Sequence, residues 1–158
     1  MEGTQSGGTI PDEVIKSEQT PEQWKRRRIE LAKWAEREKV RRSPKQIGWL
    51  NGVEVDAELV KTLRILNRLG IQTEFSCAGV SPLDEPEEHS LYAYVTLVDS
   101  PLSEAFVMHA IQKMKHRLLV SYEPSIQRYD LSSFMVGQNR SFCLLLEVCA
   151  KTFEAQQR

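Results

Sequence analysis

The sequence predicts an α+β domain in which a mainly antiparallel sheet of about five strands has helices on one face, preceded by an N-terminal helix and a flexible tail. Segments rich in aromatic and β-branched residues predict the strands, and apolar residues at helical spacing predict the helices. After residue 50 the predicted order is helix, strand, strand, helix, strand, strand, strand, which favours a mainly antiparallel sheet. The length of 158 residues suits one such domain with an appendage.

The composition is that of an ordinary globular protein, with 41% hydrophobic and 27% charged residues. No apolar run approaches the roughly 20 residues of a membrane span, and the N-terminus lacks the pattern of a signal peptide, so we expect a cytoplasmic protein. Cys77, Cys143 and Cys149 contain no C-x-x-C pair, which argues against a disulfide framework and a zinc site. Neither a metal nor a cofactor is expected.

Residues 1–42 are predicted to form the appendage. Residues 1–20 hold few apolar residues and are interpreted as a disordered tail. Thr20-Pro21-Glu22 then combines a cap, a proline at the first helical position and an acidic first turn, which predicts a helix to about Val40. From residue 22 to residue 46, ten Lys and Arg stand against four Glu, which is typical of a solvated helix face or of contact with nucleic acid or an acidic partner.

The apolar residues of this helix form a narrow stripe of Trp24, Leu31, Trp34 and Ala35. Such a stripe is too narrow for a helix that packs into a globular core. The helix could fold back onto its own domain or cross onto a second subunit. We therefore interpret residues 21–42 as a candidate dimerisation arm and predict a homodimer or higher homo-oligomer.

Residues 47–158 are predicted to be a single ligand-binding domain, which follows a linker over residues 43–52. Asp56 can cap a helix whose apolar residues recur at helical spacing, and Gly70 is a natural left-handed terminator. A short strand over residues 71–75 follows, and then a polar exposed loop over residues 81–88. No Gly-x-Gly-x-x-Gly fingerprint is present, which disfavours a dinucleotide-binding Rossmann domain and a P-loop.

Residues 91–98 give the best strand, and Ser100-Pro101 opens a helix by a cap followed by proline. Three more strands are predicted over residues 118–122, 125–131 and 141–149, and Glu123-Pro124 supplies the first turn between them.

The predicted ligand site centres on residues 73–79, Thr-Glu-Phe-Ser-Cys-Ala-Gly. A strand that ends in small residues lets a ligand approach the backbone closely, and the free N–H groups of such a turn can hold an anion or an adenine edge. The alternative is a crowded structural turn in which Cys77 is an apolar filler. A catalytic cysteine is not favoured, because nothing in the sequence places a histidine or a helix start beside Cys77.

Residues further along the chain complete the predicted site. Two tyrosines of the next strand can stack on a base or lie on a partly exposed sheet face. Three arginines near strand ends are suited to phosphate contacts. The predicted ligand-binding residues are Phe75, Ser76, Cys77, Ala78, Gly79, His89, Tyr92, Tyr94, Arg117, Arg128, Asn139 and Arg140.

Thr73-x-x-Ser76-Cys77-Ala78-Gly79 and the later Glu123-Pro124 turn resemble the core of the wybutosine-synthesising methyltransferase family, over roughly residues 55–131. That resemblance implies S-adenosylmethionine-dependent methylation of tRNA, with the basic helix guiding the phosphate backbone. Val80 stands where the family has arginine, and residues 135–140 replace the family's Ser-Gly-Phe-Arg-x-Ser-Gly segment. These departures favour a binder over an enzyme.

The size, the element order and the available N-terminal helix also resemble the phage Thoeris anti-defence sponge proteins, which bind cyclic ADP-ribose-type immune signals without cleaving them. The leading hypothesis is a non-enzymatic, oligomeric binder of a phosphorylated adenine-type nucleotide, of the cyclic ADP-ribose or cyclic oligonucleotide type. The alternatives are an S-adenosylmethionine-dependent RNA methyltransferase-like enzyme and a protein-interaction adaptor that uses Trp24 and Trp34.

Overall fold

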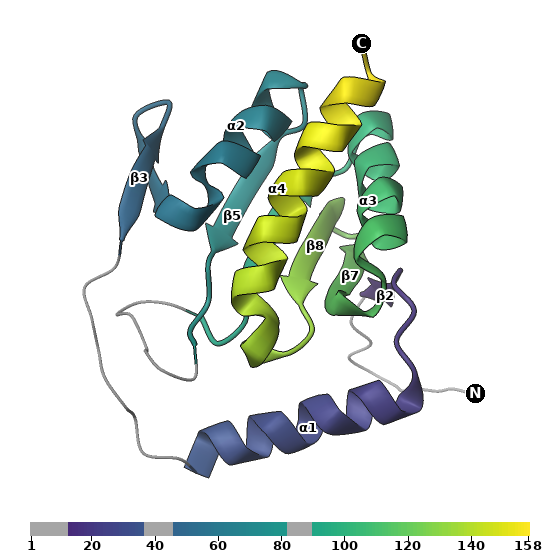
Figure 1. Cartoon of the computed structure of the whole chain (residues 1–158). Helices are drawn as coiled ribbons and strands as arrows, with labels where there is room; N and C mark the ends of the chain where they lie inside the picture. Colours follow the sequence, from purple (N-terminus) through teal and green to yellow (C-terminus); the bar gives the residue numbers. More distant parts are fainter. Residues whose placement is uncertain (1–12, 37–45, 82–89) are drawn as a thin grey trace.

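A five-stranded antiparallel sheet is the centre of the computed structural model, which describes residues 13–36, 46–81 and 90–158 (Figure 1). The spatial order of the strands is β2-β7-β8-β6-β5, and every neighbouring pair is antiparallel. The bounds are β2 Val14–Ile15, β5 Thr73–Cys77, β6 Tyr94–Val98, β7 Leu118–Glu123 and β8 Arg128–Ser133. The predicted α+β class is therefore confirmed.

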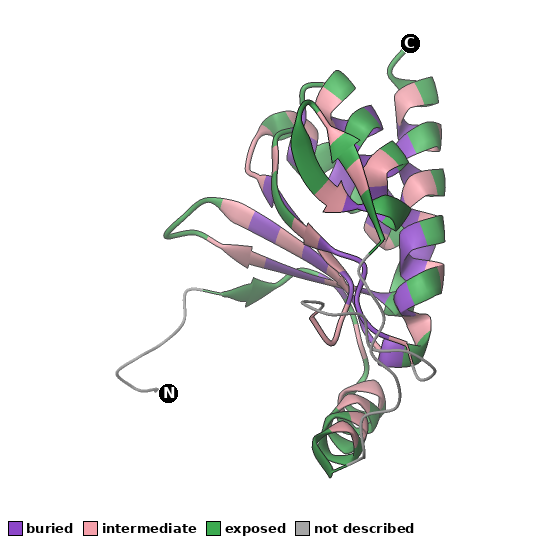
Figure 2. Cartoon of the chain, turned by 90° about the vertical axis from the view of Figure 1, so that its left-hand side faces the viewer, coloured by how far each residue is buried: buried purple, intermediate pink, exposed green. Residues whose placement is uncertain are grey.

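Three helices cover one face of the sheet: α2 Val60–Arg68, α3 Pro101–Met114 and α4 Asn139–Gln156 (Figures 1 and 2). Local signals explain where they begin and end. The Ser100 hydroxyl accepts a hydrogen bond from the Ser103 amide and caps α3, and Gly70 follows α2 with a φ of 93°. None of the described helices combines the length and apolar character needed to cross a membrane.

The hydrophobic core lies between the sheet and these helices. Alternate strand residues such as Val95 and Leu131 are fully buried against Phe106 of α3 and Phe142 of α4. Each such side chain contributes about 1.5–3 kcal/mol to folding. No described helix covers the opposite face, which we call the open face (Figure 2).

Helix α4 corrects the prediction of a strand over residues 141–149. The segment is apolar enough to resemble a buried strand, but Phe142, Leu146, Cys149 and Phe153 are buried at spacings of three and four residues, which is the helical period. Phe153 lies beyond the predicted strand, so the helical spacing of the buried residues becomes clear only over the full length of α4.

The linker prediction over residues 43–52 is wrong from residue 47 onward. There β3 Ile47–Leu50 and β4 Val53–Asp56 form a separate hairpin. Asn51 and Gly52 both have positive φ, 50° and 80°, as a two-residue hairpin turn of the Asn-Gly type requires. Asp56 makes no side-chain cap hydrogen bond to the following 3₁₀ turn, Ala57–Leu59, so its predicted capping role is also wrong.

The prediction of a disordered tail over residues 1–20 is wrong for its described part, residues 13–20. Strand β2 pairs with β7, the Lys16 amide donates to the Val120 carbonyl at 2.8 Å, and the Val120 amide donates to the Ser17 hydroxyl at 2.9 Å. Strand ends also shift, since β5 extends to Cys77, β6 begins at Tyr94 and β8 begins at Arg128. Residues 82–88 of the loop predicted over residues 81–88 lie outside the described residues.

Helix α1, Pro21–Glu36, crosses one end of the sheet (Figure 1). It begins with a reciprocal cap, in which the Gln23 amide donates to the Thr20 hydroxyl at 3.2 Å and the Thr20 amide donates to the Gln23 side chain at 2.8 Å. No residue of α1 is fully buried, so the helix rests on the domain by one stripe. The predicted helix end near Val40 lies outside the described residues.

A carboxylate cluster on the open face predicts that acid stabilises the sheet. Arg128 bridges Glu123 at 3.1 Å and Asp130 at 3.2 Å, and Glu13 brings a third carboxylate within 4.8 Å of these two. Burial, and then the hydrogen bond with Glu123, raise the pKa of Asp130 to about 6. The folded state therefore keeps a proton that the unfolded state releases above about pH 4, and stability falls as the pH rises from about 4 to 6.

We expect Asp130→Asn to raise the free energy of unfolding at pH 7.5 by roughly 1 kcal/mol, a value that allows for solvent screening at a carboxylate that is 24% exposed. Urea unfolding at pH 7.5 and at pH 4 measures it. The gain should vanish at pH 4, where wild-type Asp130 is protonated, and an equal gain at both values would contradict this account.

Candidate functional site

Most of the sequence-predicted site residues lie at one end of the sheet. At this end β5 finishes at Cys77, β8 finishes at Ser133 and β7 begins at Leu118, and α1 crosses below them (Figure 1). We call this region the α1 end. The predicted residues in it are Ser76, Cys77, Ala78, Gly79, Tyr92, Tyr94, Arg117, Asn139 and Arg140.

The turn after β5 has its backbone donors engaged within the chain. The Ala78 amide donates to the Asp56 carboxylate at 2.6 Å, and the Gly79 amide donates to the Cys77 sulfur at 3.5 Å. The Ser90 amide donates to the same sulfur at 3.2 Å. Side chains, rather than these amides, are therefore the groups that the α1 end offers to a ligand.

Asn139, the first residue of α4, ties three segments together beneath this turn. Its side chain is buried, and its Nδ2 donates to the carbonyls of Val80 at 2.6 Å and Leu91 at 2.9 Å. Its Oδ1 accepts from the Ala93 amide at 2.9 Å and from the Ser133 hydroxyl. Asn139 therefore positions the turn and the start of β6, and its polar atoms are already satisfied.

Arg27 of α1 stacks on the aromatic ring of Tyr92. Its guanidinium lies 3.8 Å from the ring centroid and donates to the carbonyls of Phe134 at 2.6 Å and Ser133 at 3.3 Å. Burial lowers the pKa of Arg27, but a guanidinium stays charged at neutral pH. This contact fixes α1 to the edge of the predicted site.

Glu30 and Trp24 complete the contact between α1 and the domain. The Glu30 carboxylate accepts hydrogen bonds from the Tyr92 hydroxyl at 3.1 Å and the Val136 amide at 2.9 Å. Burial raises the pKa of Tyr92 to about 12, so its phenol remains a donor. The Trp24 ring meets Phe134 edge-on at 5.1 Å. In this structure α1 thus packs against its own domain.

The α1 end carries an excess of exposed cationic side chains. They are Lys25, Arg26, Arg28 and Lys33 of α1, Lys115 and Arg117 before β7, and Arg140 in the first turn of α4. The carboxylates of Glu22, Glu30 and Glu36 of α1, and that of Asp56 at the turn, offset part of this charge. The remaining positive potential favours an anionic ligand.

Three predicted residues, Phe75, Tyr94 and Arg128, face the open side of the sheet, and Arg128 lies at the opposite end from α1. Its guanidinium carbon is 5.9 Å from the Phe75 ring, and its charge is shared with Glu123 and Asp130. Arg128 is therefore separated from Arg117 and Arg140. His89 lies outside the described residues.

The buried thiols do not resemble nucleophiles. Burial raises the pKa of Cys143 to about 12 and that of Cys149 to about 11, which disfavours the reactive thiolate. Cys77 is also buried, and its sulfur serves as a hydrogen-bond acceptor within the turn. The α1 end is therefore equipped to bind by charge and stacking.

Sequence reasoning missed Arg27, Glu30 and Asp56 as residues that shape this site. Arg27 stood within a run of basic residues, and no local signal connects it with Tyr92, which is 65 positions away. Asp56 has the sequence signature of a helix cap, whereas its carboxylate binds the turn amide of Ala78.

Comparison of this chain with protein-family models, with curated proteins and with solved structures finds no significant match.

Proposed function

We propose that this protein binds and sequesters a phosphorylated adenine-type nucleotide, of the cyclic ADP-ribose or cyclic oligonucleotide class, at the α1 end. The observation that carries the proposal is the set of exposed Lys and Arg side chains at the end of the sheet where Arg27 stacks on Tyr92. Guanidinium and ammonium groups recognise phosphates, and aromatic faces stack on bases. Together they match the two halves of a nucleotide.

The start of α4 adds to this arrangement. Arg140 is exposed in the first turn of an 18-residue helix whose first turn holds no acidic residue. The positive end of the helix dipole and the arginine therefore act in the same direction on an anion. Arg140 is the side chain we assign to the phosphate, and the stacking surface we assign to the base is the face of the Tyr92 ring opposite Arg27.

Several features support binding without chemical change. Burial favours the protonated forms of Cys143 and Cys149, and His109 of α3 is engaged with the Thr152 hydroxyl of α4 at 2.8 Å. A binder that sequesters a signal needs an affinity near nanomolar, about −12 kcal/mol. Assembly of two or more subunits, through the exposed Ile29 and Leu31 of α1, is part of the proposal.

Calorimetric titration with cyclic ADP-ribose isomers and cyclic di- and trinucleotides tests the proposal. We expect near-nanomolar binding of one class, and Arg140→Glu should weaken it at least about tenfold through loss of a charged hydrogen bond. The matched control is Arg64→Glu, at an exposed position of α2 outside the site, which should leave the affinity unchanged. Absence of heat with every nucleotide would refute the proposal.

An RNA methyltransferase-like enzyme is the second candidate, and the exposed cations Lys25, Arg26, Arg28 and Lys33 of α1 favour it. This candidate requires binding of S-adenosylmethionine and an RNA affinity that falls steeply with salt. Titration with S-adenosylmethionine separates the two, because only the enzyme should release heat. A salt-independent or absent RNA affinity would remove the second candidate.

A further inference from the structure

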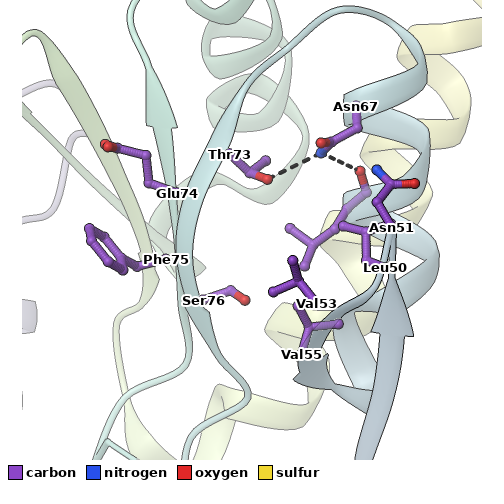
Figure 3. Close-up of a pocket in the computed structure, with 10 residues that line it drawn as sticks. Leu50, Asn51, Val53, Val55, Asn67, Thr73, Glu74, Phe75 and Ser76 are labelled. Carbon is purple, nitrogen blue, oxygen red and sulfur yellow. Dashed lines mark hydrogen bonds between the residues drawn. The ribbon is translucent and has the colours of Figure 1, made fainter.

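The outer edge of β5 borders a groove that the α1 end does not use. Strand β5 is last in the spatial order of the sheet, so no described strand pairs with its outer edge. The hairpin β3–β4 stands beside this edge, and a cavity of about 220 Å³ lies between them (Figure 3). The groove adjoins the α1 end at Ser76, but neither Tyr92 nor Arg140, the residues assigned to the nucleotide, lines it.

Strand geometry leaves main-chain hydrogen-bonding groups along this edge. The Val98 amide donates to the Gln72 carbonyl at 2.9 Å, so Gln72 faces β6 and the next residue, Thr73, faces away from it. The Ala78 amide points away from β6 and donates to Asp56. Main-chain groups two residues apart in a strand point in the same direction, so those of Ser76 also point away from β6. Thr73 and Ser76 therefore present N–H and C=O groups to the groove.

The two sides of this edge differ in chemistry. On the hairpin side the cavity has an apolar lining, formed by Leu50, Val53, Val55 and Leu63, into which Ser76 points (Figure 3). Glu74 and Phe75 point the other way, onto the open face (Figure 3). A register shift between Thr73 and Ser76 allows these two consecutive side chains to share one face.

We propose that an extended segment of a partner protein, with the pattern apolar–Lys/Arg–apolar, adds to the outer edge of β5 as an extra strand. Its main chain pairs with Thr73 and Ser76. Successive side chains of a strand point to opposite faces, so the two apolar side chains enter the cavity and the cation between them meets Glu74 and Phe75.

Charge and shape select this occupant. The Glu74 carboxylate is exposed and has no hydrogen-bonding or charged partner among the described residues, and no described Lys or Arg lines the cavity. Phe75 is 56% exposed, and Arg128 already places a guanidinium 5.9 Å from its ring, so this ring accommodates a cation.

The cavity volume also favours side chains of a peptide over an enclosed small molecule. At about 220 Å³ it is smaller than the roughly 300–1,000 Å³ of pockets that surround a drug-sized ligand. It can take one or two aliphatic side chains, while the unpaired edge supplies the hydrogen bonds that a strand requires.

Fluorescence anisotropy with a labelled Thr-Val-Lys-Val-Thr peptide and the full chain tests the proposal. We expect saturable binding, which N-methylation of the central peptide bonds abolishes because it removes main-chain donors. Glu74→Lys should weaken binding about fivefold, as expected for a surface ion pair, and a Thr-Val-Glu-Val-Thr peptide should regain it. Glu18→Lys, an exposed charge reversal away from β5, is the control that should change nothing.

NMR spectra of the wild-type chain provide a second test, which does not depend on how the variants fold. Amide NMR signals of Thr73 and Ser76 should shift on addition of the lysine peptide, whereas those of Arg140 should not. Equal binding of the N-methylated peptide, an unchanged affinity in Glu74→Lys, or no binding of the lysine peptide would each overturn the proposal. None of these outcomes bears on nucleotide binding at the α1 end.

Discussion

Asn139→Ala should lower the free energy of unfolding by roughly 3–5 kcal/mol. The substitution leaves the buried Val80 carbonyl and Ala93 amide without these partners, and it leaves the Leu91 carbonyl only the long hydrogen bond of 3.5 Å from the Val80 amide. Each unsatisfied buried group costs about 1–3 kcal/mol. The start of α4 would also lose the hydrogen bonds that connect it to the turn after β5.

Urea denaturation measures this loss, and two further variants make it specific. Asn139→Asp keeps the shape and the acceptor but removes the amide donor, so it should cost nearly as much as alanine. Arg140→Ala, at the next and exposed position, should stay within about 0.5 kcal/mol of the wild type. A loss below about 1 kcal/mol for Asn139→Ala would contradict the role assigned to this side chain.

Gly79→Ala should destabilise the protein by more than about 3 kcal/mol. Gly79 has a φ of 78°, which costs an L-residue about 1–2 kcal/mol. A Cβ there would also lie 2.6 Å from the backbone nitrogen of Ala93 and 2.5 Å from Nδ2 of Asn139. Because the first of these atoms belongs to the backbone just before β6, relief of the overlap requires the turn itself to move.

Gly70→Ala provides the matched control, since Gly70 has a φ of 93° and a Cβ there would meet nothing within 4 Å. It should show only the conformational cost, about 1–2 kcal/mol. The difference between the two variants, measured by thermal and urea unfolding, isolates the close contact at Gly79. Equal losses of unfolding free energy in the two variants would show that the turn accommodates a Cβ at Gly79, which would contradict this account.

Elements with strong local signals were predictable from sequence. Helix α3 begins where Ser100 and Pro101 predicted it, and Gly70 ends α2 in the predicted left-handed conformation. Elements that depend on distant partners were not. Strand β2 contains two residues, and it forms because Ser17 and Lys16 bond to Val120, 103 and 104 positions away.

In the candidate site, too, features with a local sequence signal were predictable and contacts with distant residues were not. The turn at residues 76–79 was recognisable because small residues follow a strand, and the positive φ of Gly79 agrees with that reading. Sequence could not show that Asp56 and Cys77 engage the turn amides, or that Arg27 covers Tyr92. These contacts depend on tertiary distances, which no local pattern encodes.

Amide NMR spectra of the full chain, recorded during addition of the nucleotide with the highest calorimetric affinity, test the central claim most directly. The account predicts that the largest shifts fall on Gly79, Tyr92 and Arg140 and on the indole of Trp24, which contacts Phe134 at the α1 end. The nucleotide should be recovered chemically unchanged after the protein is denatured. Shifts that centre on Phe75 and Arg128 of the open face, or a chemically altered nucleotide, would contradict the account.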